Sequence, residues 1–463
     1  MFIGRKQELK QLQALYQTNR FQLPVIYGRR RVGKTALINE FSKGKDVIFF
    51  TSIESSAKQN LENLSRAIFN FTSSSSSSPI FGSFQDALEY VFELAATRRI
   101  VLAIDEYPYA AKAHKALGSI LQSLIDKHKD HSKLFLILCG SSMSFMEEQV
   151  LGYQSPLYGR RTAQFKIQPF SYFESRTYFS HFSDLEMAFI YGIVGGTPQY
   201  LLQMDDSLSV EENIKRSILN PNAYLFEEPN NLLKQEVREA AVYNAIISAI
   251  ASGSTRISEI SSKIGEESGA CATYIKKLIS LGLVRKETPF GEKPSRRTIY
   301  AIEDNLFRFW YRFIPSNIAL LQNNMIETAY RSMEGQFTTH MGPIFEEICK
   351  QYLWQLNQQD KAAITFTALG RWWGNDPQKK SETEIDIMGT DNLGNALFCE
   401  CKWTNEPVDL AVLETLVYRG SLFHHNTKHY YLFSRSGFTE GCVATASAMG
   451  NVRLISFEDM IVL

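Results

Sequence analysis

The chain has 463 residues, of which 44% are hydrophobic and 21% charged, the composition of a folded globular protein of about three domains. Lysine and arginine together number 49, as do aspartate and glutamate, so the chain has no net positive charge that would attract nucleic acid. Binding of nucleic acid would therefore need a local basic patch. No apolar run approaches the roughly 18 residues of a membrane span, so we expect no membrane partner.

The positions of the cysteines and histidines limit the disulfides and metal sites that the chain can form. The six cysteines are scattered, with no C-x-x-C pair and no signal peptide ahead of them, which predicts a reducing, cytoplasmic setting without disulfides or structural zinc. His424, His425 and His429 could form a metal cluster, although surface histidines in a loop before a strand are the commoner explanation.

The first functional pattern follows a short apolar strand, Pro24–Tyr27. A glycine ends this strand, and Gly33, Lys34 and Thr35 then open a helical pattern, which fits the P-loop template G-x-x-x-x-G-K-[ST]. In such a loop the backbone N–H groups and the helix dipole face phosphate, the lysine reaches the β- and γ-phosphates, and the threonine hydroxyl ligates Mg²⁺. The pattern therefore predicts an ATP and Mg²⁺ site. The residues expected at the nucleotide are Gly28, Arg29, Arg30, Arg31, Val32, Gly33, Lys34, Thr35 and Ala36.

A second pattern supplies the carboxylates that this site needs. After a low-complexity surface loop at Ser73–Ser78, an uninterrupted apolar strand, 100–104, ends in Asp105 and Glu106. Strand burial would bring Asp105 to the water shell of Mg²⁺, and Glu106 would polarise the attacking water as general base. A further apolar strand ends shortly before Ser141, which we expect to sense the γ-phosphate, although an ordinary strand-to-turn serine fits equally well.

Two arginines precede the next predicted strand, 164–167. Arg160 or Arg161 could act in cis or in trans as an arginine finger towards a nucleotide, and the trans case would make the protein a homo-oligomer. A solvated basic corner is the alternative. Oligomeric state and protein partners therefore stay open at this point.

These motifs and two others together resemble the archaeal-type ATPases, a branch of the AAA+ and STAND P-loop NTPases that also occurs in bacteria. The segments that carry the resemblance are 2–9, 28–35, 104–106, 157–160 and 195–201. The resemblance implies a five-stranded parallel sheet flanked by helices, followed by a helical lid. It also assigns the turn that ends at Pro198 to a contact with the adenine side of the nucleotide.

From about Val242 the pattern changes to three short amphipathic helices and a hairpin, which predicts a winged helix-turn-helix. Between residues 254 and 300 nine Lys/Arg stand against five Glu, a net charge of +4 in a neutral chain. Contact with the phosphates of DNA is the natural use of such a patch. The residues expected to make it are Lys276, Lys277, Lys293, Arg296 and Arg297. The alternative is a winged helix that serves only as a packing module.

The C-terminal third combines acids and a lysine. Two predicted strands carry Asp386 and, in the order E-x-K, Glu400 and Lys402, while Glu346 lies at the edge of the apolar face of a preceding helix. Alternation places Glu400 and Lys402 on one face of their strand. Two carboxylates and a lysine on neighbouring strands can bind Mg²⁺ and hold a water for attack on phosphate. A surface hairpin with charged ends is the alternative.

This arrangement resembles the PD-(D/E)xK nuclease superfamily, with Asp386 as the first acid and Glu400-Cys401-Lys402 as the (D/E)xK element. Glu346 matches the additional helical acid of some branches. The resemblance implies a nuclease-like domain with a metal held by Asp386, Glu400 and Glu346, and it leaves open whether cleavage is retained.

The expected fold class is multidomain α/β. The predicted domains are a P-loop ATPase core at 1–168, a helical lid at 169–238, a winged helix-turn-helix at 239–315 and a restriction-endonuclease-like domain at 316–463. In the main interpretation, ATP and ADP control a DNA-directed winged helix and a nuclease-like module. In the alternative the chain is a non-catalytic, ATP-dependent switch that docks DNA or a protein partner with a degenerate nuclease domain.

Overall fold

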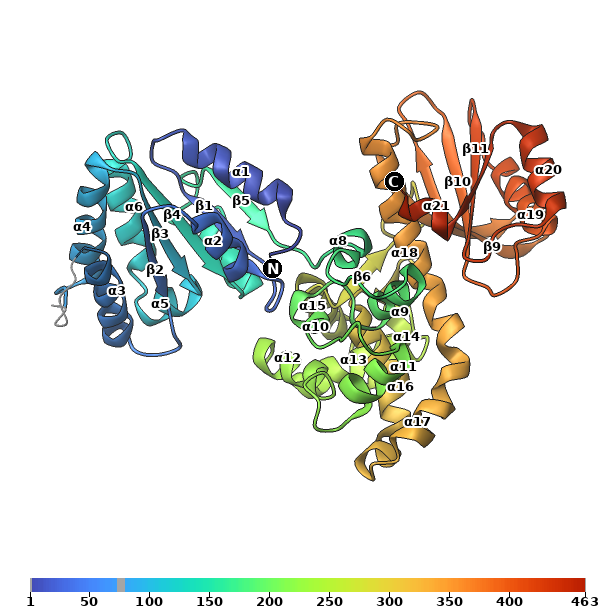
Figure 1. Ribbon diagram of the computed structural model, residues 1–463, viewed down its shortest axis with the longest axis horizontal. Helices are drawn as coiled ribbons and strands as arrows, with labels where there is room; N and C mark the ends of the chain where they lie inside the picture. Colours follow the sequence, from blue (N-terminus) through green and yellow to red (C-terminus); the bar gives the residue numbers. More distant parts are fainter. Residues whose placement is uncertain (1, 73–79, 463) are drawn as a thin grey trace. The chain divides into compact units, whose positions relative to one another are not determined.

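A computed structural model of the chain describes residues 2–72 and 80–462, so the predicted loop at Ser73–Ser78 lies outside the described residues. The chain divides into two compact units (Figure 1). The first comprises Met1–Phe170 and Thr197–Gln199, and the second comprises Ser171–Gly196 and Tyr200–Leu463. The finer division into four domains remains a prediction.

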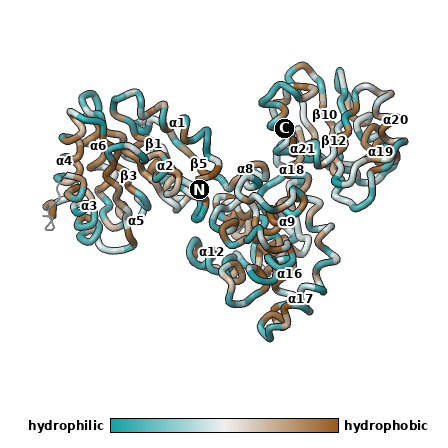
Figure 2. The backbone as a smooth tube through the Cα atoms, viewed as in Figure 1, coloured by the Kyte–Doolittle hydropathy of each residue, from teal (hydrophilic) through white to brown (hydrophobic). Residues whose placement is uncertain are grey.

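The first unit is built on a five-stranded, wholly parallel sheet of order β2-β3-β4-β1-β5. Its strands are β1 (Pro24–Tyr27), β2 (Val47–Thr51), β3 (Ile100–Asp105), β4 (Leu134–Gly140) and β5 (Ala163–Lys166). Every residue of β1, β3 and β4 is buried, because helices cover both faces of the sheet, and this explains their uninterrupted apolar sequences. In Figure 2 strand β3 is mostly hydrophobic, whereas the covering helix α1 is largely hydrophilic.

Two hydrophobic cores lie on opposite faces of this sheet. Helices α1 and α2 contribute to one core, and α3 to α6 contribute to the other. The helices of the unit are α1 (Lys6–Gln17), α2 (Lys34–Ser42), α3 (Ala57–Thr72), α4 (Phe84–Thr97), α5 (Tyr107–Ala113), α6 (Leu117–His128), α7 (Met143–Phe145) and the π-helix η1 (Met146–Val150). Because all five strands run the same way, the loops after β1, β3 and β4 meet at one edge of the sheet.

The second unit begins with a helical region. Its elements are α8 (Tyr172–Arg176), α9 (Asp184–Val194), α11 (Val210–Ile214), η2 (Lys215–Leu219) and α12 (Glu228–Glu236), with the short α10 (Pro198–Leu201) at the junction. Three further helices and a hairpin follow: α13 (Ala240–Ala251), α14 (Ile257–Ile264), α15 (Ser268–Ser280), β6 (Val284–Glu287) and β7 (Ile299–Ile302). These are the helices and hairpin that the sequence predicts between residues 242 and 300.

A longer helical stretch leads to the C-terminal sheet. It comprises α16 (Asn305–Gln322), α17 (Ile326–Met333), the short 3₁₀ turn η3 (Glu334–Gln336) and α18 (Phe337–Gln358). Helix α16 is 18 residues long, and its first half is rich in buried aromatic residues. Helix α18 contacts α9 and also β9 and β10 of the C-terminal sheet, so it packs on both the helical region and the sheet.

The C-terminal sheet has the order β12-β11-β10-β9-β8, with β8, β9 and β10 antiparallel and β10, β11 and β12 parallel. The strands are β8 (Ala368–Asp376), β9 (Ser381–Thr390), β10 (Ala396–Lys402), β11 (Lys428–Ser434) and β12 (Val452–Ser456). The helices are α19 (Leu410–Ser421), α20 (Glu440–Met449) and α21 (Phe457–Ile461). Central strand β10 is buried over its first six residues, which brings the E-x-K element into the interior of this sheet.

Candidate functional site

The loop between β1 and α2 has the conformation that a phosphate-binding loop requires. Gly33 takes φ 89° as the N-cap of α2 and offers no side chain to the first N–H groups of that helix. A Cβ atom on Gly28 would lie 2.4 Å from the carbonyl oxygen of Ile167, so only glycine fits there. The amino end of a nine-residue helix therefore opens onto the loop without a capping side chain.

Lys34 lies within the curve of this loop. Its Nζ donates hydrogen bonds to the carbonyl oxygens of Gly28 and Arg29, both at 2.9 Å, and the side chain is buried. A cation and a helix amino end at the same place form a site that suits the anionic phosphates of a nucleotide.

The predicted magnesium ligands of the first unit are in contact. The Thr35 hydroxyl donates to Asp105 Oδ2 at 2.7 Å, and Asp105 Oδ1 accepts the backbone N–H of Glu106 at 3.0 Å. A hydroxyl and a carboxylate side by side are oxygen ligands of the class that Mg²⁺ takes. The residues present thus fit a Mg²⁺–nucleotide complex.

Glu106 and Ser141 also meet at this edge of the sheet. Ser141 donates to Glu106 Oε2 through its hydroxyl at 2.8 Å and through its backbone N–H at 3.2 Å. Glu106 itself has φ 50°, the left-handed conformation, at the N-cap of α5. In this structure the serine predicted as a γ-phosphate sensor therefore holds the carboxylate predicted as general base.

Three further contacts hold the phosphate-binding loop. Arg29 donates to the Thr197 hydroxyl at 2.6 Å, and Pro198 lies 3.6 Å from the place that a Cβ of Gly33 would take. Arg5 donates to the carbonyl of Val32 at 3.1 Å. The segment Thr197–Gln199 thus reaches the loop from far along the chain, as the assignment of Pro198 to the nucleotide requires. No short sequence pattern indicates the partner of Arg29, because the two residues meet only in the folded unit.

Arg160 is placed differently. Its guanidinium forms a bidentate ion pair with Asp126 of α6, at 3.0 and 2.6 Å, and also donates to the carbonyl of Pro156 at 3.0 Å. None of these partners belongs to the phosphate-binding loop. The arginine-finger role of Arg160 remains a prediction.

In the second unit Asp386 and Glu400 meet where β9 and β10 diverge. The ladder between these strands ends at the pair Cys399 and Ile387, and the next residues in register are Glu400 and Asp386. Beyond that point Asp386 Oδ2 accepts the backbone N–H of Cys401 at 2.8 Å in place of a ladder bond. Both carboxylates are buried, with Asp386 8% and Glu400 5% exposed.

Two cations hold Glu400. Lys402 Nζ donates to Oε1 at 2.7 Å, as the E-x-K spacing suggests, and Arg419 Nη1 donates to Oε2 at 2.9 Å. Arg419 belongs to α19 and was not a predicted site residue. No local signal marks it, since it comes from a different element and reaches Glu400 only because α19 packs on β10.

Asp386 lies in the field of two other carboxylates, those of Glu400 and Glu346. Burial raises the pKa of Asp386 well above its usual range, and the charges of Glu400 and Glu346 raise it further. Burial also raises the pKa of Glu346. Among the described residues no group of three His, Cys, Asp or Glu side chains is arranged to hold a metal ion, so the structure does not assemble Asp386, Glu400 and Glu346 as a three-ligand site. Two carboxylates with water are nonetheless a sufficient protein share for Mg²⁺, so Asp386 and Glu400 fit that ion.

The basic residues of the middle region fall into two groups. Lys276, Lys293 and Arg296 are exposed, and Lys277 is partly exposed. Arg297, in contrast, pairs with Glu292 at 2.5 Å. The exposed side chains of Lys276, Lys293 and Arg296 can reach a phosphate backbone in solvent, whereas Arg297 forms an ion pair with Glu292.

The hairpin loop between β6 and β7 packs on the C-terminal sheet. The backbone N–H of Phe290 donates to the carbonyl of Arg371 in β8 at 2.9 Å. The Phe290 ring packs against the core that Ile385 and Phe398 help to form. The loop predicted as a DNA-binding wing is therefore also a packing element.

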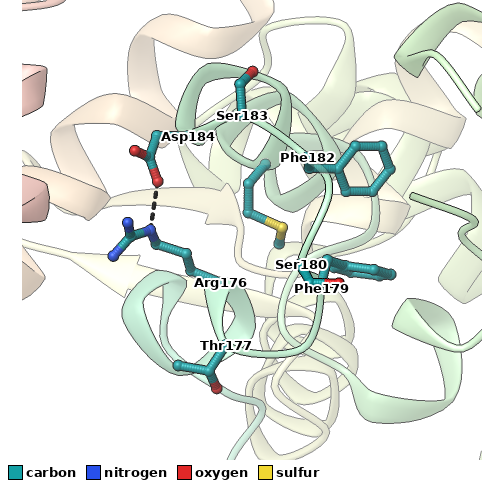
Figure 3. A pocket seen from close by; sticks show the side chains of 8 residues that line it. Arg176, Thr177, Phe179, Ser180, Phe182, Ser183 and Asp184 are labelled. Carbon is teal, nitrogen blue, oxygen red and sulfur yellow. Dashed lines mark hydrogen bonds and ion pairs between the residues drawn. The ribbon is translucent and has the colours of Figure 1, made fainter. Parts of the chain in front are cut away.

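One hollow in the second unit, of about 280 Å³, is unrelated to these sites (Figure 3). Its lining residues are Arg176, Thr177, Phe179, Ser180, Phe182, Ser183, Asp184 and Met187. Arg176 and Asp184 form an ion pair across its rim. None of the predicted site residues lines it.

Comparison with protein-family models identifies two regions. Residues 2–204 match a family described as an ATPase domain predominantly from Archaea, and residues 310–413 match one described as archaeal and bacterial proteins of unknown function. Within the described parts of the chain, no helix combines the length and apolarity needed to cross a bilayer.

Known proteins resemble the chain over most of its length. An uncharacterized protein of Methanocaldococcus jannaschii is 32% identical over 405 residues, covering 87% of this chain and 88% of the relative. An uncharacterized ATP-binding protein of the same organism is 47% identical over 47 residues, which are 10% of this chain and 80% of that one. Among solved structures, a Walker-type ATPase of Pyrococcus abyssi aligns with a TM-score of 0.51 at 18% identity, over 67% of this chain and 96% of that chain, and shares the fold.

Proposed function

The chain belongs to the family of archaeal-type ATPases, and from this premise we propose that it binds ATP with Mg²⁺ at the β1–α2 loop and hydrolyses it with Glu106 as general base. The observation that carries the proposal is the direct hydrogen bond between Thr35 and Asp105, because it joins the two predicted magnesium ligands at the edge where Lys34 and the amino end of α2 face phosphate. Bound Mg²⁺ would neutralise charge on the phosphates.

The test compares three full-length variants with the parent. Lys34→Ala should abolish tight binding of ATP, because the loop loses its phosphate cation. Glu106→Gln should bind ATP within a few-fold of the parent but lower turnover by roughly 10²- to 10⁴-fold, the usual contribution of a general base. Glu148→Gln, at an exposed position of the same unit, is the control and should match the parent. Parent-like turnover in Glu106→Gln would refute the assignment of the base.

For the second unit we propose DNA binding by the winged helix-turn-helix and a Mg²⁺ site at Asp386 and Glu400. Support comes from exposed Lys276 and partly exposed Lys277 of α15, and from the convergence of two buried acids with Lys402. Asp386 and Glu400 would hold Mg²⁺, and Lys402 would orient a water or stabilise charge on a phosphodiester. If the domain cleaves DNA, Asp386→Asn should abolish Mg²⁺-dependent nicking of a plasmid, while Glu414→Gln, at an exposed position of α19, should not.

A non-catalytic switch is the second candidate. Its support is that both key glutamates are engaged in this structure, Glu106 by Ser141 and Glu400 by two cations. Such a protein would bind ATP and DNA without turning over either. Single-turnover assays distinguish the candidates, because the switch shows nucleotide binding with no product at stoichiometric enzyme.

We also propose a reducing, cytoplasmic location. All six cysteines are buried free thiols, as expected where disulfides do not form.

A further inference from the structure

Arg419 lies in the last turn of α19, outside every motif of the sequence. Its Nη1 donates to Glu400 Oε2 at 2.9 Å. The side chains of Arg419 and Glu400 are 20% and 7% exposed, so bulk solvent and salt screen this pair only weakly. The contact is therefore a specific, partly buried ionic hydrogen bond rather than a surface ion pair.

This bond occupies an oxygen that a metal would need. Lys402 already takes Glu400 Oε1 at 2.7 Å, so both oxygens of the carboxylate accept a hydrogen bond from a cation. Lys402 is two residues from Glu400 on the same strand, whereas Arg419 extends a long side chain from a helix. Because Arg419 comes from a different element, its side chain can leave Glu400 without any change in β10, which carries Glu400 and Lys402.

The charges of the site favour an anion once a metal enters. The side chains of Asp386, Glu400, Lys402 and Arg419 sum to zero when all four are ionised, and an ionised Glu346, whose charge also acts on Asp386, would add one negative charge. A divalent ion adds two positive charges, and the displaced guanidinium loses its carboxylate partner. Guanidinium groups bind phosphate oxygens well, so a phosphodiester satisfies both the metal and the freed arginine.

We propose that Arg419 exchanges between Glu400 and a phosphodiester of DNA: it covers Glu400 while the metal is absent and binds the phosphodiester when the metal is held by the two acids. The inference rests on the magnesium site proposed above. Under this exchange Arg419 weakens metal binding in the DNA-free protein and strengthens DNA binding in the metal-bound protein.

The experiment uses the full-length protein without nucleotide. Binding of Mn²⁺ alone is measured by calorimetry, and affinity for a short DNA duplex is measured with and without Ca²⁺. Arg419→Met should bind Mn²⁺ roughly tenfold tighter than the parent, because one ionic hydrogen bond no longer competes, and should lose most of the Ca²⁺-dependent gain in DNA affinity. Arg419→Lys, which keeps the cation, should restore both properties in part.

Two further variants control the measurement. Arg453→Met removes the same charge from an exposed position on β12 and should change neither affinity. Asp386→Asn should remove Mn²⁺ binding at this site and so identifies it. Circular dichroism of Arg419→Met checks that the variant is folded.

Opposite changes in the two affinities support the exchange, since a purely structural role for Arg419 would not raise one while lowering the other. Equal Mn²⁺ affinity in the parent and Arg419→Met would overturn the exchange but leave the magnesium site intact. Absence of Mn²⁺ binding in both folded proteins would overturn the magnesium site and the exchange together.

Discussion

Glu106 and Glu400 carry their carboxylates in contrasting hydrogen bonds. Glu106 accepts neutral donors, the hydroxyl and backbone N–H of Ser141, whereas Glu400 accepts two charged donors. The carboxylate acceptor makes both sets of bonds charge-assisted, but only the bonds to Glu400 are also ion pairs, which adds Coulomb attraction between the two partners. At the scale of single residues, the Glu106 carboxylate is therefore held less strongly than the Glu400 carboxylate.

Buried His340 provides a test of stability at this scale. One ring nitrogen, Nε2, lies 3.0 Å from the carbonyl oxygen of Gly192, and the ring packs on Phe309 and Phe313. Burial lowers the pKa of His340 to about 3, and the charges of Arg308 and Arg312 act in the same direction.

In the unfolded chain His340 takes up a proton near its ordinary pKa of about 6.5, whereas in the folded protein it stays neutral down to about pH 3. The free energy of unfolding therefore has its full contribution from neutral His340 above pH 6.5 and loses it progressively as the pH falls towards about 3. We expect His340→Gln, which cannot titrate, to lose less unfolding free energy than the parent between pH 6.5 and 4 in urea denaturation. His424→Gln, at an exposed position, is the control. Equal pH slopes in the parent and His340→Gln would contradict the assignment.

At the scale of elements, the β6–β7 hairpin joins the middle region to the C-terminal sheet. Phe290 donates its N–H to the carbonyl of Arg371, and its ring lies so close to Gly370 that a Cβ there would be 2.9 Å from it. Arg297 is similarly close to Gly374. Strand β8 thus carries two glycines where the hairpin loop approaches, and the loop has less freedom than a solvated wing.

Removing the Phe290 ring tests this contact. Since the ring is partly buried, Phe290→Ala should lower the free energy of unfolding by about 1–3 kcal/mol, somewhat less than for a fully buried phenylalanine. Chemical denaturation measures the loss of unfolding free energy, and faster amide hydrogen exchange in β8 would show that the loss is located there. Lys293→Ala, on the exposed part of the same loop, should stay within about 0.5 kcal/mol of the parent.

Helix α15 should provide the larger share of DNA contacts, because Lys276 is exposed on it, whereas the hairpin loop packs on β8 through Phe290. We expect Lys276→Ala/Lys277→Ala to reduce the salt slope of duplex binding by up to about two, since each phosphate that a lysine neutralises adds about 0.9 to that slope. Lys293→Ala/Arg296→Ala should reduce it less. An unchanged slope in the first double variant, measured by fluorescence anisotropy over a range of salt concentrations, would indicate a packing role for the middle region.

At the scale of the whole molecule, the chain passes between the two units after Phe170, after Gly196 and after Gln199. The short segment Thr197–Gln199 belongs to the nucleotide-binding unit, and its Thr197 accepts a hydrogen bond from Arg29. A change at the phosphate-binding loop therefore acts on a segment that continues directly into the second unit on both sides.

If the bound nucleotide controls DNA binding by the second unit, Thr197→Val should weaken that control more than it weakens nucleotide binding. We expect a non-hydrolysable ATP analogue to change the DNA affinity of the parent by roughly 5- to 150-fold, the range of ordinary allosteric coupling, and to change that of Thr197→Val several-fold less. Thr18→Val, at an exposed position of the same unit, should keep the parent's response. Because coupling is reciprocal, DNA must change the affinity of the parent for nucleotide by the same factor. If DNA leaves the nucleotide affinity of the parent unchanged, the coupling is excluded.

Much of the architecture could be predicted from local pattern alone. The loop from Gly28 to Thr35, the strand that ends in Asp105 and the E-x-K strand are each a short run whose burial and spacing carry the signal. The edge strand β8 was missed, since glycines and a register irregularity between Gly370 and Trp372 interrupt its alternation. Periodicity detects an element only where the burial of that element is regular.

The sequence by itself determined the family, the parallel nucleotide-binding sheet and the identity of most candidate site residues, because backbone geometry and alternation act within a few residues of each motif. Only the tertiary structure decided that Ser141 holds Glu106, that Thr197 meets Arg29, and that Arg419 takes an oxygen of Glu400. These partners lie on separate elements. Their contacts depend on how helices pack on sheets, and packing depends on the volumes and shapes of many side chains together, which no short stretch of sequence records.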